Sequence, residues 1–112
     1  MAAWKNLDTL ASYGELSKLK NHVDIAKAMS GENGAERVKT YSTPMAEGLA
    51  YNYAAKQVDD KLLEDLQKLA DEAQLTEKFE ALYNGEVINT GEKRMVLHHL
   101  TRGQLGEAVN AD

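Results

Sequence analysis

DDKLLEDLQKLADEA, residues 59–73, is the stretch of sequence that decides the fold class. Its apolar residues recur every three or four positions and form one broad face, as in an amphipathic helix; they are Leu62, Leu63, Leu66, Leu69, Ala70 and Ala73. Asp59 or Asp60 supplies the N-cap, because a short acidic side chain accepts hydrogen bonds from N–H groups of the first turn. We therefore predict a helix here and a mainly α chain around it.

Downstream of this stretch, the sequence predicts two more helices separated by an extended loop. The first has Thr76 as a candidate N-cap and ends at Asn84-Gly85, a favoured helix stop. Residues 86–91 are expected to form the loop, and residues 92–101 a final helix. Residues 103–112 contain two glycines and no continued periodicity, so we expect them to connect this segment to absent domains.

Upstream, the apolar periodicity predicts a first helix from Trp4 to Val23, interrupted near Gly14. A short second helix is expected after Asp24, its N-cap, and it should stop in the glycine-containing segment of residues 30–34. That segment is also compatible with a phosphate-binding loop, but no Gly-Lys-Ser/Thr follows it. A helix cap and turn is the interpretation we retain.

Two candidate strands flank the single proline, Pro44. They cover residues 37–43 and 49–53, so a small β-hairpin is expected between the helices. Leu49, Tyr51 and Tyr53 alternate along the second strand and should lie half-buried on one face. A stacking platform for bases or sugars is the alternative interpretation of these side chains.

Composition excludes several classes of function. The chain has 112 residues and a net charge of -5, so one domain is expected and no cationic surface attracts nucleic acid or an anionic membrane. It contains no cysteine, which excludes disulfides and thiolate metal sites. No apolar run approaches the roughly 20 residues that cross a bilayer. We expect a cytoplasmic segment that binds neither nucleic acid nor membrane.

Acidic residues outnumber lysines between positions 59 and 80. A solvated helix surface is the expected explanation, and a docking face for a basic partner is the alternative. The acids are Asp59, Asp60, Glu64, Asp65, Asp71, Glu72, Glu77 and Glu80.

The sequence offers little chemistry of its own. His98 and His99 are adjacent, so on a helix they point roughly 100° apart and cannot easily share a metal. Arg94 and His98 are four residues apart and would share a face of the predicted last helix, where they could bind an anion or play a structural part. We therefore assign no catalytic residue, no metal ligand and no cofactor, and keep Arg94 as the one candidate for substrate binding.

One segment carries a family resemblance. GEVINTGEKRMVLH, residues 85–98, resembles the glucose-6-phosphate isomerase pattern G-E-x-I-N-x-T-E-x-R-A-V-L-H. It departs from that pattern at Gly91 and Met95, and Arg102 also falls where the family often has an arginine. The likeness upstream of this segment is weaker. The specificity of the whole resemblance rests on residues 85–102.

The resemblance implies an enzyme several times this length, built from αβα sandwich (SIS-type) domains. Residues 1–112 would be its N-terminal helical segment. Such enzymes interconvert glucose 6-phosphate and fructose 6-phosphate in glycolysis and gluconeogenesis, without a metal or organic cofactor, and usually as homodimers. The family's catalytic residues lie downstream of the matched region, so the segment alone is expected to be inactive and to need the remaining domains. Arg94 and His98 would orient a wall beside the site, and direct sugar-phosphate contact by Arg94 is the alternative.

Two other functions compete with this one. The chain could be an independent helical protein-interaction module, with the acidic helix of residues 59–73 as its docking face. It could also be a small self-contained enzyme that uses histidine and glutamate.

Overall fold

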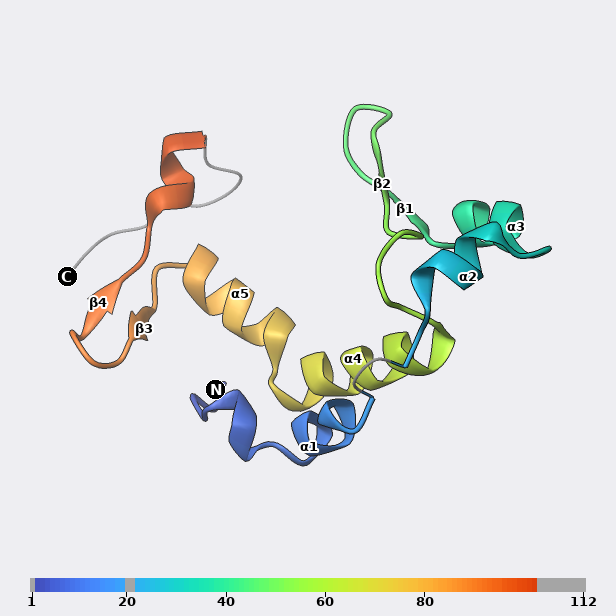
Figure 1. The fold of residues 1–112 in the computed structure, drawn as a ribbon. Helices are drawn as coiled ribbons and strands as arrows, with labels where there is room; N and C mark the ends of the chain where they lie inside the picture. The colour runs from blue at the N-terminus through green and yellow to red at the C-terminus, as the bar shows by residue number, and fades with distance from the viewer. Residues whose placement is uncertain (1, 20–21, 103–112) are drawn as a thin grey trace. The chain divides into compact units, whose positions relative to one another are not determined.

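The computed structural model describes residues 2–19 and 22–102. They divide into two compact units, one made of residues 11–68 and one made of the residues up to Leu10 together with those from Leu69 onward. Within the described ranges, helices account for most of the regular structure, and the strands form two antiparallel pairs (Figure 1). The prediction of a mainly α segment with a small hairpin is confirmed.

The unit formed by residues 11–68 contains α1 (Ala11–Ser17), α2 (Ile25–Ser30), α3 (Gly34–Thr40) and the first part of α4 (Asp60–Glu72). Aspartate side chains cap two of these helices, α2 and α4. The Oδ1 atom of Asp24 accepts from the N–H of Lys27 at 3.2 Å, as predicted for α2. The Oδ1 atom of Asp59 accepts from the N–H of Leu62 at 2.9 Å, so Asp59 caps α4.

The first helix is shorter than predicted. Residues Leu7–Thr9 form a 3-10 turn, η1, and Leu10 then takes an extended conformation that separates this turn from α1. The Thr9 hydroxyl donates to the Asn6 carbonyl at 2.6 Å, a local bond that competes with helix propagation. Gly14 lies inside α1 and does not interrupt it. Glycine costs a helix only about 1 kcal/mol, which neighbouring turns can offset.

Helix α3 replaces the first part of a predicted strand. Residues 37–40 were expected to be extended, but they complete α3, and the strand begins at Ser42. Gly34 starts the helix against the end of α2, where a Cβ would lie 2.2 Å from the Met29 carbonyl oxygen. The close approach of two backbones thus overrides the β propensity of Val38 and Thr40.

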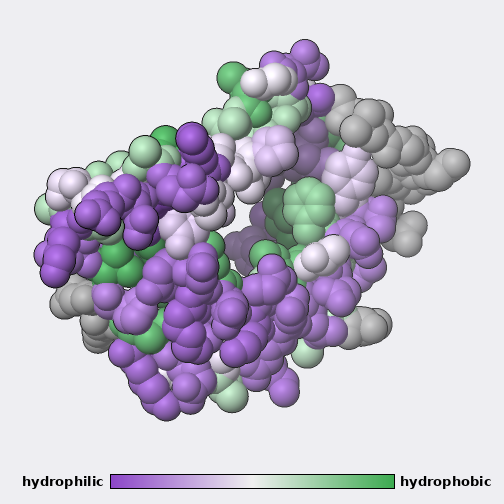
Figure 2. Space-filling view, turned by 90° about the vertical axis from the view of Figure 1, so that its right-hand side faces the viewer, coloured by the Kyte–Doolittle hydropathy of each residue, from purple (hydrophilic) through white to green (hydrophobic). Residues whose placement is uncertain are grey.

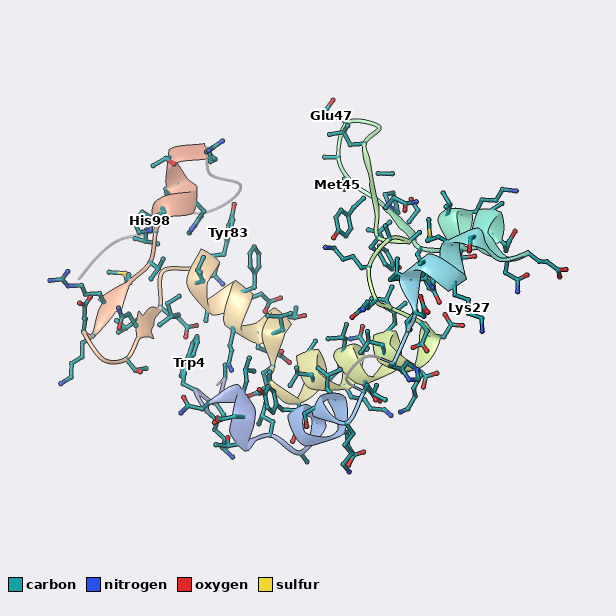
Figure 3. The ribbon with its side chains drawn as sticks, viewed as in Figure 1. Trp4, Lys27, Met45, Glu47, Tyr83 and His98 are labelled. Atoms are coloured by element: carbon teal, nitrogen blue, oxygen red, sulfur yellow. The ribbon has the colours of Figure 1, made fainter. Side chains whose placement is uncertain are left out.

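The predicted hairpin is present. Strand β1 (Ser42–Pro44) pairs antiparallel with β2 (Ala50–Asn52), with Thr43 opposite Tyr51. Glu47 and Gly48 adopt positive φ angles of 59° and 74° in the tight turn, and Glu47 lies at its tip (Figure 3). Pro44 fits because a two-stranded pair leaves each strand an outer edge that needs no N–H donor.

Arg37 fastens the base of this hairpin to α3. Its Nε donates to the Ala54 carbonyl at 2.8 Å, and its Nη2 donates to the carbonyls of Lys56 and Val58 at 2.9 and 2.7 Å. The guanidinium carbon also lies 4.7 Å from the ring centroid of Tyr41. One charged side chain thereby satisfies three carbonyls in the segment that leads into α4.

Tyr41 and Tyr53 form the packed side of the hairpin base. Their ring centroids are 5.5 Å apart, and the Tyr41 hydroxyl donates to Oδ1 of Asp60 at 3.0 Å. Tyr51 stacks on Tyr53 at 5.9 Å but stays 47% exposed, and Leu49 is 64% exposed. The prediction of a half-buried face therefore holds for Tyr51 and is wrong for Leu49, which lies in the turn before β2 and is mostly exposed.

In the other unit, the described elements are η1, the end of α4, α5 (Leu75–Tyr83), β3 (Val87–Asn89), β4 (Arg94–Met95) and the 3-10 helix η2 (His98–Arg102). Helix α5 begins at Leu75, after Gln74 in a left-handed conformation, so Thr76 is not its cap. It ends as predicted: Gly85 has a φ of 78°, and Glu86 and Gly85 donate to the carbonyls of Ala81 and Leu82.

The N-terminal residues pack on α5. The N–H of Ala3 donates to Oε1 of Gln74 at 2.7 Å, and Nζ of Lys78 lies 5.3 Å from the centroid of the Trp4 ring. Helix α5 also packs against β3, and Ala81 within it is buried. Segments far apart in the sequence thus pack on this helix.

Apolar burial is sparse among the described residues. Of the apolar and aromatic side chains, only Tyr41, Ala54, Ala73 and Ala81 are buried, while several large ones remain more than two-fifths exposed. On the face drawn in Figure 2, hydrophilic side chains predominate and hydrophobic ones appear as separate patches.

Candidate functional site

The segment that carries the family-like pattern, residues 85–102, forms a second hairpin followed by a short 3-10 helix. Val87 of β3 lies opposite Met95 of β4, and Asn89 lies opposite Arg94, with a register shift between the two pairs. The predicted helix over residues 92–101 is therefore wrong. Lys93 takes a positive φ of 55°, which reverses the chain where that helix was expected to propagate.

Asn89 and Glu92 build the turn between these strands. The Oδ1 atom of Asn89 accepts from the N–H of Glu92 at 3.1 Å, and its Nδ2 donates to Oε2 of Glu92 at 3.3 Å. Nη1 of Arg94 lies 3.9 Å from the same Oε2 atom. Three polar positions of the pattern thus meet in one turn. The Asn89 side chain makes the hydrogen bond to the N–H that a backbone carbonyl makes in an ordinary turn.

Arg94 is open to solvent. Its side chain is 76% exposed, and that of Glu92 is 65% exposed. An exposed ion pair of this length is weak, so the guanidinium keeps donors that can bind an anion.

His98 does not pair with Arg94 as predicted. It is the first residue of η2 and is exposed, whereas Arg94 lies in β4, so the two do not share a helix face (Figure 3). The hydroxyl of Thr101 donates to the His98 carbonyl at 2.8 Å and holds the 3-10 turn. The anion site expected from a four-residue helical spacing is thus not formed by these two side chains.

His99 has a more enclosed setting than its neighbour. Its ring stacks on Tyr83 with centroids 4.7 Å apart, and both ring nitrogens are buried without a hydrogen-bond partner among the described residues. The contact joins η2 to the C-terminal end of α5. Sequence reasoning considered His99 as a metal ligand and rejected that role, and it missed the stacking partner, which cannot be read from residue spacing.

A charged cluster lies elsewhere, between α1 and α4. Asp65 is 3% exposed and accepts from Nζ of Lys61 at 2.8 Å, with Nζ of Lys68 at 3.5 Å. The hydrogen bond from Lys61 is the main cause that holds the pKa of Asp65 below its ordinary value. A cavity of about 80 Å³ adjoins the cluster, and Ser12 and Glu15 also line it. The solvated-face prediction is therefore wrong for Asp65.

A second side-chain contact joins His22 to the start of α4. Nε2 of His22 meets Oδ2 of Asp59, whose other oxygen caps the helix. Both side chains are about one-third exposed. This contact anchors the connection after α1 and requires no ligand.

Residues 2–19 and 22–102 contain neither a metal-binding cluster nor a membrane-spanning helix. No three histidine or acidic side chains there lie in positions that could hold a metal ion. The same residues include no helix with the length and apolar character needed to span a bilayer.

Comparison with known proteins places these observations in a family. A family model described as phosphoglucose isomerase matches residues 52–112. The glucose-6-phosphate isomerase of Treponema denticola is 53% identical over 110 residues, which is 95% of this chain and 21% of that protein. The glucose-6-phosphate isomerase of Borrelia garinii subsp. bavariensis is 42% identical over 113 residues, which is 100% of this chain and 20% of that protein. The chain spans about a fifth of the length of the curated relatives it matches.

Proposed function

Since the chain belongs to the phosphoglucose isomerase family, we propose that it is a non-catalytic N-terminal segment of an enzyme that interconverts glucose 6-phosphate and fructose 6-phosphate. The observation that carries the proposal is the 53% identity over 110 residues with a protein named glucose-6-phosphate isomerase. The whole enzyme carries out the reaction, and this segment has a structural role in it.

The contents of the described residues support a scaffold role. The histidine–arginine pair expected in the last helix is not formed, and the most enclosed carboxylate, Asp65, is held by two lysines. Arg94 is highly exposed on a small hairpin. A sugar phosphate needs convergent donors in a water-poor site, so catalysis requires groups from the remaining domains.

The remaining parts of the proposal follow from the family. The parent enzyme is a cytoplasmic homodimer of αβα sandwich domains that takes part in glycolysis and gluconeogenesis and uses no metal or organic cofactor. Residues 85–102 form a wall near its site, and residues 103–112, which lie outside the described residues, lead into the next domain.

A chimera tests the proposed function. In it, this chain replaces the matched region of the Treponema denticola isomerase. We expect the chimera to isomerise fructose 6-phosphate in a coupled assay and the isolated chain to show no activity above buffer. Turnover by the isolated chain would refute the scaffold role. A folded chimera without activity would refute the assignment of this segment to the enzyme.

The same chimera tests Arg94. If Arg94 only shapes the wall, Arg94→Gln should change the KM for fructose 6-phosphate by less than about twofold. Direct contact with the phosphate would instead raise KM by about tenfold or more, because a charge-assisted hydrogen bond is lost. His98→Asn is the matched control, because His98 is exposed on the neighbouring 3-10 helix.

An independent interaction module is the alternative considered from the sequence. The comparisons support the isomerase interpretation, and the acidic helix α4 offers no feature that favours the module. Its most buried acid, Asp65, is paired within the chain and is not displayed for a partner.

A further inference from the structure

Two asparagines of the chain are followed directly by glycine, at Asn33-Gly34 and Asn84-Gly85. An asparagine in this setting is chemically labile, because a glycine has no Cβ to keep its backbone nitrogen away from the preceding side-chain carbonyl. Every other asparagine of the chain is followed by a residue that has a Cβ. The chain therefore contains the same reactive pair twice, and the fold decides how reactive each pair is.

The first pair is locked between α2 and α3. The N–H of Gly34 donates to the Gly31 carbonyl at 3.0 Å, and the Asn33 carbonyl accepts from the N–H of Arg37 at 2.9 Å. Gly34 is buried against α2, where even a Cβ would lie 2.2 Å from the Met29 carbonyl oxygen. Rotation of the backbone between Asn33 and Gly34 would break both bonds and displace α3. The Gly34 nitrogen is therefore held away from the Asn33 side chain.

The second pair lies at the C-terminal end of α5, where the chain leaves the helix toward β3 (Figure 1). Asn84 is exposed, and no described residue hydrogen-bonds to its side chain or its carbonyl. The N–H of Gly85 donates to the Leu82 carbonyl at 3.2 Å, and that of Glu86 donates to the Ala81 carbonyl at 2.9 Å. These two bonds close the last turn of a helix, and helix ends open more readily than packed segments.

Open space adjoins the Asn84 side chain. Asn84 lines two open hollows of about 390 Å³ each, and Glu80 lines both of them as well. Glu86 also lines the first hollow. The amide of Asn84 therefore has room to turn toward the Gly85 nitrogen, and water has access to the group that would form.

We propose that Asn84 is a site of spontaneous deamidation and that the fold protects Asn33 from the same reaction. The Gly85 nitrogen loses its proton and bonds to Cγ of Asn84, the Cγ–Nδ2 bond breaks, and Nδ2 takes up a proton and leaves as ammonia. Water then opens the resulting succinimide ring at either of its carbonyls, which gives aspartate or isoaspartate. The reaction consumes only water. The inference uses local geometry alone and does not rest on the proposed function.

Both products alter the start of the family-like segment. A carboxylate at position 84 puts negative charge at the C-terminal end of α5, which the helix dipole disfavours, and one turn away from Glu80. Isoaspartate also adds a methylene to the backbone before Gly85, so the bonds from Gly85 and Glu86 to the last turn of α5 no longer fit together. Amide protection should therefore fall at the end of α5 and in β3 as the product accumulates.

Peptide mass spectrometry of the incubated chain tests the proposal. The readout at each asparagine is the conversion of the amide to aspartate and isoaspartate over time at neutral pH. Synthetic peptides of residues 29–38 and 80–89 report the two rates without the fold. In the folded chain, Asn84 should react at least about tenfold faster than Asn33, whereas the two peptides should differ by less than about threefold.

Urea provides the control for the fold. Unfolding should raise the rate at Asn33 to that of its peptide, because it removes the packing of Gly34 on α2. Equal rates at Asn33 and Asn84 in the folded chain would overturn the proposal. An Asn33 rate that stays low in urea would also overturn it, since the sequence and not the fold would then protect that residue.

Asn84→Gln tests the consequence of the reaction. The longer side chain closes a ring less readily, so this variant should form almost no acidic product at position 84, while Asn33 reacts as before. Hydrogen exchange after incubation should then show β3 protected in the variant and loosened in the unsubstituted chain. Loss of protection at the same rate in both proteins would show that deamidation at Asn84 is not its cause and would refute that consequence.

Discussion

The two hairpins differ in where their support comes from. β1–β2 is held at its base by Arg37 and Tyr41, whose hydrogen-bond partners lie 17 to 21 residues away in the sequence. β3–β4 is held at its turn by Asn89 and Glu92, which are three residues apart. The first hairpin therefore depends on the packing of its unit, whereas the second is set mainly by local bonds. Substitutions at the two sets of residues should therefore destabilise one hairpin without the other.

The largest effect is expected from Arg37→Leu. It removes the donors to three carbonyls and the contact with the Tyr41 ring, so the free energy of unfolding should fall by about 3 kcal/mol. Urea denaturation followed by circular dichroism measures the loss. Arg37→Lys keeps the charge without the planar fork and should recover only part of it. A loss below about 1 kcal/mol would mean that the base of β1–β2 is not held from α3.

The second largest effect is expected from Gly34→Ala, which should lower the free energy of unfolding by about 2 kcal/mol. The new Cβ would meet the Met29 carbonyl and push α3 away from α2. Displacement of α3 carries Arg37 with it, so amide exchange should accelerate in β1–β2 and not in β3–β4. The control is Gly14→Ala, where nothing lies within 4 Å of the added methyl; helix propensity predicts a gain of up to about 1 kcal/mol. Similar effects from both substitutions would refute the close-packing explanation.

Tyr41→Phe removes one hydrogen bond to Asp60 and should cost about 1 kcal/mol at neutral pH. Burial, followed by the hydrogen bond to Asp60, raises the pKa of Tyr41 above its ordinary value. Folding therefore favours the protonated phenol, and its contribution is complete below the ordinary pKa of about 10 and is lost as pH rises above it.

Alkaline titration should thus loosen β1–β2 before β3–β4, which contains no tyrosine. Two-dimensional NMR at increasing pH follows the two hairpins separately. Tyr41→Phe should lack the part of the alkaline loss of stability that Tyr41 causes. Tyr51→Phe, which changes an exposed ring, should still show that loss. An identical alkaline profile in the Tyr41 variant would contradict the assigned cause.

The smallest effect is expected from Asn89→Ala. It removes two bonds in an exposed turn, so the free energy of unfolding should fall by about 0.5 kcal/mol, with exchange accelerated only in β3–β4. Thr90→Ala changes the same turn but spares those bonds and serves as the control. An effect that spreads to β1–β2 would show that the second hairpin is not locally supported.

The sequence predicted the elements whose signals are local. Helix α4 and its cap at Asp59, α2 and its cap at Asp24, and the stop at Gly85 all follow from the spacing and chemistry of neighbouring residues. The family assignment was also available from residues 85–102, and residues 52–112 match the family model.

The errors fall where distant or irregular contacts decide. Residues 37–40 became helical because Gly34 meets the α2 backbone and Arg37 reaches a loop far along the chain. The apolar run Val96-Leu97 and the spacing of Arg94 to His98 suggested a helix, but the Asn89–Glu92 turn and the positive φ of Lys93 produce a hairpin instead. The role of Arg94 stays a prediction until the chimera is measured.

The contact between Trp4 and Lys78 places the tryptophan signal of the chain in one of its two units. Trp4 is the one tryptophan of the chain, and it reports on the unit that contains α5. The stacked tyrosines Tyr41, Tyr51 and Tyr53 belong to the other unit. Tyr83 lies in the same unit as Trp4, so a Tyr83→Phe variant confines the near-ultraviolet tyrosine signal to the other unit. Tryptophan emission excited at its red edge, recorded beside that signal, then reveals whether the two units melt together or in sequence, with no label added.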